Sequence, residues 1–322
     1  MPMGTKINRA WLLDTAQRIH RYVPQLEDRV YYFPQGHVNA LQQFPESSSP
    51  PYLAFAPKTC LVDCVVRQVT YDFPTQSDYS RCQSVIVNVT LAVVQLPLPR
   101  KSSNPNRPFH FDFTGPRTTR FSQVAEQVFT VTMRHCGLAE FLVLRDVVDR
   151  TLAHPWRVGM RISAKYEDGD GEDVNATFTE YSGTITQISD SAPVSYPHSP
   201  WEALEVRFDP SAGSVSSSDD DTRLSPWETS LFDAATASSS SSSGNSHGSE
   251  TNGLHLPQSQ CERIDRELGE LLVANPAYSV FNDAVSEEDF PDYGCIVAVP
   301  MHVELIRERL RSNYYRQVSY YI

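Results

Sequence analysis

The chain has 322 residues, 40% of them hydrophobic, which is enough to form the cores of two or three domains. There are 27 basic and 39 acidic residues, giving a net charge of −12 without a basic cluster, so the overall field disfavours binding to duplex DNA. An acidic balance favours a basic partner such as a histone tail, and it equally serves plain solubility. The six cysteines show no C-x-x-C pair or zinc-finger spacing, and the chain has no phosphate-binding glycine loop or G-x-S-x-G sequence. We therefore expect no metal site, no cofactor and no enzyme.

Four regions follow one another along the chain. Apolar spacing predicts an N-terminal helix within residues 1–21. Residues 22–232 are β-rich, because stretches such as "TCLVDCVVRQVTYDF", "SVIVNVTLAVV" and "VFTVTM" are dense in β-branched and aromatic residues. The Ser/Gly-rich residues 233–257 predict a disordered linker. Residues 258–322 show helical spacing, as in "QCERIDRELGELLVAN" and "VELIRERLRSNYY". The sequence predicts a mixed, mainly β fold with a helical C-terminal part.

The stretch "VYYFPQGH" at residues 30–37 places three aromatic rings before a turn. In a strand, Tyr31 and Phe33 face one side and Tyr32 the other. The rings then either pack in a buried strand or belong to a small barrel that recognises a peptide.

Residues 156–232 carry three short strand patterns separated by turn residues. Tyr166 is near the end of the first, Tyr181 near the start of the second, and Phe208-Asp209 at the end of the third. This order is typical of a Tudor-like β-barrel in which the rings meet at one end. A cage with Asp209 as counter-charge would bind a methylated lysine. We take Tyr32 as a reserve wall, and for each ring alone core packing is the competing interpretation.

Several ordered motifs resemble a known family. "VPQLEDRVYYFPQGHVNAL", "FTVTMRHCGLAEFLVLRD", "RVGMRI", "SGTI", "YPHSPWEALEVRFD" and "LSPWE" look like the conserved stretch of the bromodomain and WD-repeat proteins, the family of the pleckstrin-homology-domain-interacting protein. The resemblance implies a composite, or cryptic, Tudor module at residues 22–232 that reads methylated lysine 4 of histone H3. Members of that family place two adjacent tryptophans before "GTI", whereas this chain has Glu180-Tyr181-Ser182, so we expect a cage with one ring fewer.

A second family shares part of these motifs. Plant auxin response factors are similar in "VYYFPQGH", in an "EF-V" strand before "VGMR", and in a "GTI" strand. They insert a B3 DNA-binding domain between the first and second of these motifs, and residues 39–128 show no such domain. The tail "AYSVFNDAVSEEDFPDYGCIVAVPMHVELIRERLRSNYY" resembles the first half of a bromodomain, which favours the first family.

The bromodomain resemblance places three residues in the remnant of an acetyl-lysine pocket: Phe281, Val285 and Tyr293. The segment at residues 258–322 ends before the asparagine that would hold acetyl-lysine, so we expect no binding of that mark. Our leading hypothesis is a nuclear, non-enzymatic chromatin protein whose partners are the histone H3 tail and chromatin complexes, with no membrane association and no sequence-specific DNA binding. The alternatives are a scaffold module without a ligand and a DNA-binding transcription factor similar to auxin response factors.

Overall fold

The structure is a computed structural model, and it describes most of the predicted strands and helices. The predicted N-terminal helix and nearly all of the Ser-rich segment lie outside the described residues. The described residues are 23–43, 59–72, 86–95, 127–134, 141–168, 177–192, 194–196, 198–210, 221–231, 255–286, 288–290, 293, 297 and 300–316.

The first sheet contains five antiparallel strands in the order β4-β3-β2-β1-β5. Its strands are β1 (Arg29–Tyr32), β2 (Val62–Asp72), β3 (Ile86–Gln95), β4 (Val128–Arg134) and β5 (Leu142–Leu144). The long hairpin of β2 and β3 buries alternate residues such as Val87, Val89 and Leu91, as period-two patterning requires. Strand β1 lies between the central strand β2 and the edge strand β5 and pairs with both.

The second sheet also contains five antiparallel strands, in the order β10-β6-β7-β8-β9. Its strands are β6 (Arg161–Asp168), β7 (Thr177–Ile188), β8 (Leu204–Phe208), β9 (Thr222–Leu224) and β10 (Thr229–Leu231). The edge strands β9 and β10 are consecutive in the chain and are joined by the short helix η4 (Pro226–Glu228). A capping box formed by Ser225 and Glu228 stands at the start of this helix. Because so short a link cannot span a flat five-stranded sheet, the sheet curls back on itself.

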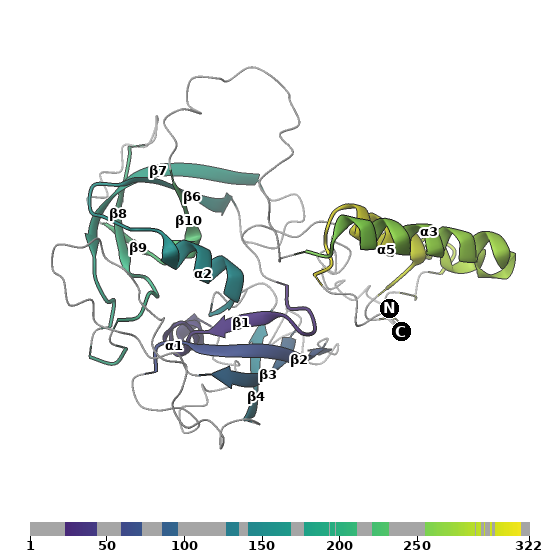
Figure 1. Cartoon of the computed structure of the whole chain (residues 1–322), viewed down its shortest axis with the longest axis horizontal. Coiled ribbons are helices and arrows are strands. Elements are labelled where there is room, and N and C mark those ends of the chain that lie inside the picture. Colours follow the sequence, from purple (N-terminus) through teal and green to yellow (C-terminus); the bar gives the residue numbers. More distant parts are fainter. Residues whose placement is uncertain are drawn as a thin grey trace, which may run out of the picture.

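Helices cover the sheets and form a separate C-terminal part (Figure 1). Their bounds are α1 (Pro34–Gln43), α2 (Arg145–Ala153), α3 (Gln258–Ala274), η5 (Pro276–Phe281) and α5 (Val303–Arg311). Helix α2 contacts β1 and β5 of the first sheet and η4 beside the second, whereas α3 contacts α5. We call the described residues up to 231 the β module and those from 255 to 316 the helical module.

One hydrophobic core runs through both sheets of the β module. Phe33, directly after β1, stacks on Trp227 with ring centroids 4.6 Å apart and lies 5.7 Å from Trp201. Gly36 lies under the same Trp201 ring, since a Cβ at this position would come within 2.5 Å of the ring carbons. The motif "VYYFPQGH" is therefore the joint between the two sheets.

The predicted fold is confirmed at the level of a mixed protein rich in antiparallel β-sheet with few helices. The turn expected after Phe33 is instead the start of α1, where Pro34 occupies the first helical position and its missing N–H costs nothing.

Candidate functional site

Three aromatic side chains of the second sheet lie against one another, and we call Tyr166, Tyr181 and Phe208 the ring cluster. Their ring centroids are 5.7 Å apart for the two tyrosines, 5.9 Å for Tyr166 and Phe208, and 6.1 Å for Tyr181 and Phe208. All three pairs are edge-to-face, with interplanar angles from 67° to 79°. Edge-to-face pairs at these distances attract each other beyond plain area burial, so the cluster is stabilised by its own contacts.

Strand register explains why these rings meet. Tyr181 is opposite Ala164, two residues from Tyr166 on β6, so the two tyrosines are diagonal neighbours on one face. Phe208 is opposite Gly183 on β7. A Cβ on Gly183 would lie 3.0 Å from Cδ1 of Phe208 and 2.8 Å from the carbonyl oxygen of Arg207, so the glycine is what allows this close approach.

The predicted counter-charge Asp209 already has a partner. Both carboxylate oxygens of Asp209 accept hydrogen bonds from the Arg161 guanidinium, one of them at 2.7 Å. The hydrogen bond from Arg161 lowers the pKa of Asp209, and the same bond raises the pKa of Arg161. Tyr166 is 38% exposed, so the cluster is open to solvent on at least one side. The structure thus brings the three rings together, with a neutralised ion pair at the end of the same strands.

Tyr32, the proposed reserve wall, is not part of this cluster. It is fully buried, and its hydroxyl group is 2.9 Å from Nδ1 of His37. Its ring packs edge-on against Phe129 and Phe141 in the core of the first sheet. The assignment of Tyr32 to a cage was wrong because its side of β1 faces the interior.

The residues assigned to an acetyl-lysine pocket lie on the surface of the helical module. Phe281 is 63% exposed and Val285 is 37% exposed, while Tyr293 is half-buried. Among the described residues, no ring contact or side-chain hydrogen bond joins these three. Their assignment to the remnant of an acetyl-lysine pocket stays a prediction.

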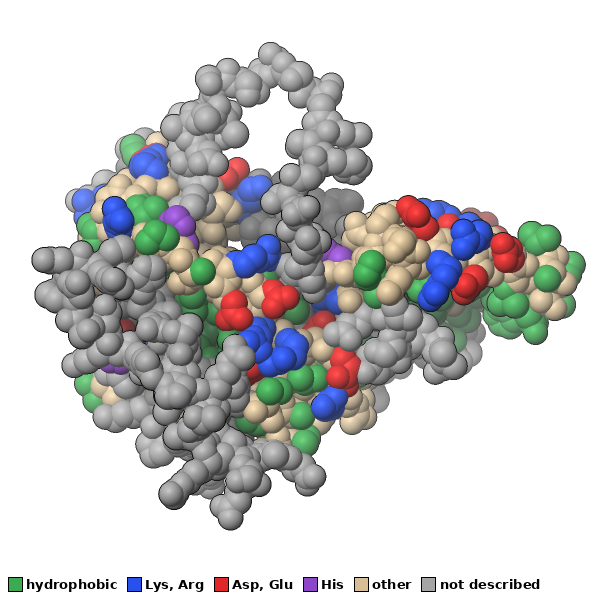
Figure 2. Space-filling view, in the orientation of Figure 1, with side chains coloured by type: hydrophobic (Ala, Val, Ile, Leu, Met, Phe, Trp, Pro, Cys, Tyr) green, Lys and Arg blue, Asp and Glu red, His purple; other side chains and the backbone are tan. Residues whose placement is uncertain are grey.

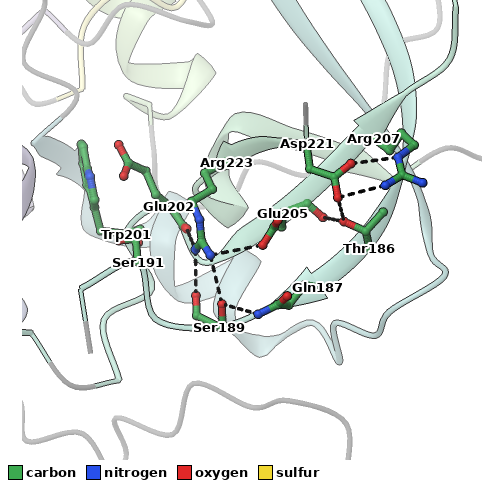
Figure 3. A network of polar contacts seen from close by, with 10 residues as sticks. All are labelled: Thr186, Gln187, Ser189, Ser191, Trp201, Glu202, Glu205, Arg207, Asp221 and Arg223. Atoms are coloured by element: carbon green, nitrogen blue, oxygen red, sulfur yellow. Dashed lines mark hydrogen bonds and ion pairs between the residues drawn. The ribbon is translucent and has the colours of Figure 1, made fainter. Parts of the chain in front are cut away.

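A polar network that the sequence did not reveal ties β9 to its neighbours (Figure 3). Arg223 donates to the carbonyl oxygens of Ser189 and Glu202 and to the carboxylate of Glu205, at 3.2 to 3.4 Å. One side chain thereby holds the loop after β7 against the edge of the sheet.

A second branch of this network lies further along β8. Asp221 accepts a hydrogen bond of 2.7 Å from Thr186 and one of 2.9 Å from Nε of Arg207. The hydrogen bond from Thr186, and then those from Arg207, lower the pKa of Asp221. Because every charged member has a partner, the network fixes a loop and offers no charge to a ligand.

The part of the chain that the structure describes contains no group of three or more His, Cys, Asp or Glu side chains placed to hold a metal ion. Nor is any described helix long and apolar enough to cross a membrane.

Comparison with known proteins gives two family matches and several relatives. Residues 141–233 match the auxin response factor ancillary domain, and residues 264–320 match the bromodomain. Auxin response factor 14 of Oryza sativa subsp. japonica is 34% identical over 122 residues, which cover 38% of this chain and 16% of that protein. Auxin response factor 24 of the same plant is 37% identical over 90 residues, and auxin response factor 2 of Arabidopsis thaliana is 33% identical over 90 residues. Those two matches cover 28% of this chain and 10% and 9% of the respective relatives.

These findings overturn the leading hypothesis of a histone reader. The relatives named above are auxin response factors, which supports the alternative of a related transcription factor over a reader of methylated histone H3. The expectation that sequence-specific DNA binding is absent is wrong for the same reason.

The motifs common to both families led to the wrong family because Phe33, Gly36 and His37 are buried packing residues. Such residues indicate the fold and do not indicate which ligand is bound. The bromodomain prediction is confirmed, and both matched families are non-enzymatic. The chain thus joins a segment similar to the auxin response factor ancillary domain to a segment similar to a bromodomain.

Proposed function

We propose that this protein is a nuclear, non-enzymatic regulator of transcription that binds DNA in the manner of auxin response factors. The ancillary-domain match covers β5, α2 and every strand of the second sheet. We infer that this curled sheet is a Tudor-like barrel that supports the DNA-binding region and does not itself read a histone. The bromodomain match on the same chain supports a role in transcription.

The observation that carries the proposal is the ladder between β1 and β5. In auxin response factors a B3 DNA-binding domain is inserted between the segments that correspond to these two strands, whereas here the intervening residues contribute β2, β3 and β4 to the same sheet. Here Val30 pairs with Leu144 and Tyr32 pairs with Leu142, and the N–H of Phe33 donates to the carbonyl oxygen of Phe141 at 2.8 Å. The framework therefore brings both ends of the intervening region to one place, as a fold that carries an insertion requires.

The charged side chains of the β module supply candidates for contacts with DNA phosphates. Six arginines of the module form ion pairs with carboxylates: Arg29, Arg67, Arg145, Arg161, Arg207 and Arg223. Arg150, Arg157 and Lys165 are exposed, and none of the three forms an ion pair with a carboxylate of the described residues. The Arg150 side chain donates to the carbonyl oxygen of Asp146, so Arg157 and Lys165 are the candidates for phosphate contacts on the described surface of the β module.

Selection from a pool of random duplexes, followed by gel shift of the full chain, tests this function. We expect a sequence-selective complex that weakens steeply between about 50 mM and about 200 mM salt, because phosphate contacts release counterions. Replacing Arg157 and Lys165 together by Ala should lower the slope of affinity against salt by about 2, since each phosphate contact contributes about 1. Arg207→Ala, which removes an ion-paired arginine, is the control and should leave the slope unchanged. Absence of a complex at low salt, or equal affinity for scrambled duplexes, would contradict the proposal.

A scaffold role is the second candidate, and the same ion pairs favour it. Acidic and basic side chains are interspersed on the visible face of the molecule (Figure 2), and the paired arginines leave little net positive charge for DNA. A scaffold predicts no DNA complex at any salt concentration. The gel shift at two salt concentrations separates the two functions directly.

A further inference from the structure

The last described residue of the helical module is bound by the first described segment of the β module. Nε of Arg316 donates to Oδ1 of Asp28 at 2.7 Å, and its NH2 group donates to Oδ2 of Asp28 at 2.7 Å. The same NH2 group donates to the carbonyl oxygen of Val23 at 2.6 Å. Only 6% of the Arg316 side chain and 1% of the Asp28 side chain are exposed. This is a bidentate ion pair shielded from water, the geometry in which an arginine and a carboxylate interact most strongly.

Gln25 reinforces this pair from the β module. Its side-chain NH2 group donates to the carbonyl oxygen of Tyr314 at 2.8 Å, and its side-chain oxygen accepts the N–H of Arg316 at 3.1 Å. Its own N–H donates to Oδ2 of Asp28 at 2.8 Å. One glutamine therefore pairs with the backbone of the helical module on one side and orients the buried carboxylate on the other.

Packing against β2 extends the contact. Burial, and then the neighbouring Tyr314, raises the pKa of Tyr71 on β2 to about 12, while Arg309 opposes this shift. The Arg309 guanidinium lies 4.4 Å from the centre of the Tyr314 ring. Tyr314 and Tyr315 also belong to the small core of the helical module, together with Leu256 and Leu310. The residues that dock are thus the residues that hold the helices together.

We propose that Asp28, Gln25 and Arg316 form a latch that holds the helical module in one fixed orientation on the β module. When an ion pair is buried, both charges lose their hydration. The attraction between them offsets this loss only in the correct geometry, so the pair specifies an orientation even where it adds little net stability. By linkage, a ligand that binds the docked helical module also stabilises the docked β module. This inference rests on the contacts alone and not on the DNA-binding proposal.

Hydrogen exchange of the full chain, followed by mass spectrometry, tests the latch. Arg316→Gln keeps a hydrogen-bond donor but removes the charge and the bidentate fork. We expect exchange at least about tenfold faster in the peptides that contain Gln25 and Arg316, because opening of the junction exposes the Gln25–Asp28 hydrogen bond to water and frees the amide of residue 316 from Gln25. Peptides from β7 and β8 should exchange as in the wild type. Three of the four tryptophans of the chain, Trp156, Trp201 and Trp227, lie in the core of the β module, so tryptophan fluorescence checks that this module stays folded.

Arg311→Gln is the matched control. Arg311 also forms ion pairs, with Asp265 and Glu304, but these lie within the helical module and not at the junction. It should leave exchange near Gln25 unchanged. Unchanged exchange near Gln25 in Arg316→Gln would overturn the proposal.

A double-mutant cycle covers the case in which Arg316→Gln unfolds the whole helical module. Denaturant unfolding is measured for Asp28→Asn, Arg316→Gln and the double variant. A latch predicts that the double variant is clearly more stable than the sum of the single effects requires, because neither charge is then left buried alone. Additive effects would show that the two side chains do not act as a pair and would overturn the latch.

Discussion

The two modules differ in how much of their stability each provides by itself. The β module has one continuous core with fully buried aromatic residues such as Tyr32, Phe33 and Trp156. The helical module buries only a small core around Leu310 and leaves large apolar side chains exposed, among them Val273 at 82% and Val280 at 72%. Burial of apolar area is the main source of stability. The β module is therefore stable by itself, whereas the helical module depends on its contacts with the β module. The comparison shows why a buried latch is found where the two meet.

The largest expected effect comes from a substitution in the large continuous core of the β module. Trp201→Ala removes a ring that is 3% exposed and contacts Phe33 and Trp227 between the sheets. We expect the free energy of unfolding to fall by about 3 to 5 kcal/mol. Denaturant unfolding followed by far-UV circular dichroism measures this loss. Val194→Ala, at a side chain that is 81% exposed, is the control and should change it by less than about 0.5 kcal/mol.

A pair of glycine substitutions gives opposite signs in the two modules. Gly36→Ala places a methyl group 2.5 Å from the Trp201 ring, and overpacking should destabilise the β module by about 1 to 3 kcal/mol. Gly269→Ala in α3 meets only the Arg307 side chain at 3.8 Å, so its better helix propensity should stabilise the helical module by about 0.5 to 1 kcal/mol. Thermal unfolding of both variants checks the signs. If both substitutions changed the melting temperature in the same direction, the proposed contrast in packing around the two glycines would be contradicted.

Acid should loosen the helical module before the β module. Burial is the main cause that lowers the pKa of His255, and the charges of Arg316 and Arg150 add to it, whereas a hydrogen bond with the Asn313 backbone opposes it. A histidine with a lowered pKa binds its proton more readily when the structure opens, so its contribution is complete above about pH 6.5 and is lost as the pH falls through the lowered pKa. We expect the melting temperature of the helical module to fall between about pH 7 and about pH 5. In His255→Gln this dependence should be weaker, and an unchanged dependence would exclude His255 as its source.

The smallest effect is expected at the exposed ion pair beside the ring cluster. Arg161→Ala removes the partner of Asp209, but the two side chains are 40% and 50% exposed, so solvent screens their attraction. The free energy of unfolding should change by no more than about 1 kcal/mol. A loss as large as that of Trp201→Ala, measured in the same unfolding assay, would show that this pair is part of the core.

Local sequence patterns predicted those features of the fold and the site that depend on strands adjacent in the chain. The convergence of Tyr166, Tyr181 and Phe208 follows from two hairpins in succession and from the alternation of side chains along them. The docking of Arg316 on Asp28 and the pairing of Val30 with Leu144 join residues far apart in the sequence, and no local pattern encodes such contacts.

The prediction of the bromodomain and WD-repeat family was wrong for a different physical reason. The motif "VYYFPQGH" is occupied by residues that pack, since Phe33 and His37 are fully buried and Gly36 is required by the Trp201 ring. Any protein built on this joint needs the same residues, whatever it binds. Exposed residues vary with the ligand, and a single sequence does not show which of them are kept among relatives.

The ladder between β1 and β5 also has a consequence for how the chain acquires its structure. Val30 is synthesised long before its partner Leu144, so the first sheet cannot be completed until the whole intervening region has been made. Closing so large a loop is entropically slow, and such non-local pairing delays folding. The pairs of β1 with β2, β2 with β3 and β6 with β7 can form early, whereas the pairing of β1 with β5 forms last and leaves one edge of β1 without its partner until then.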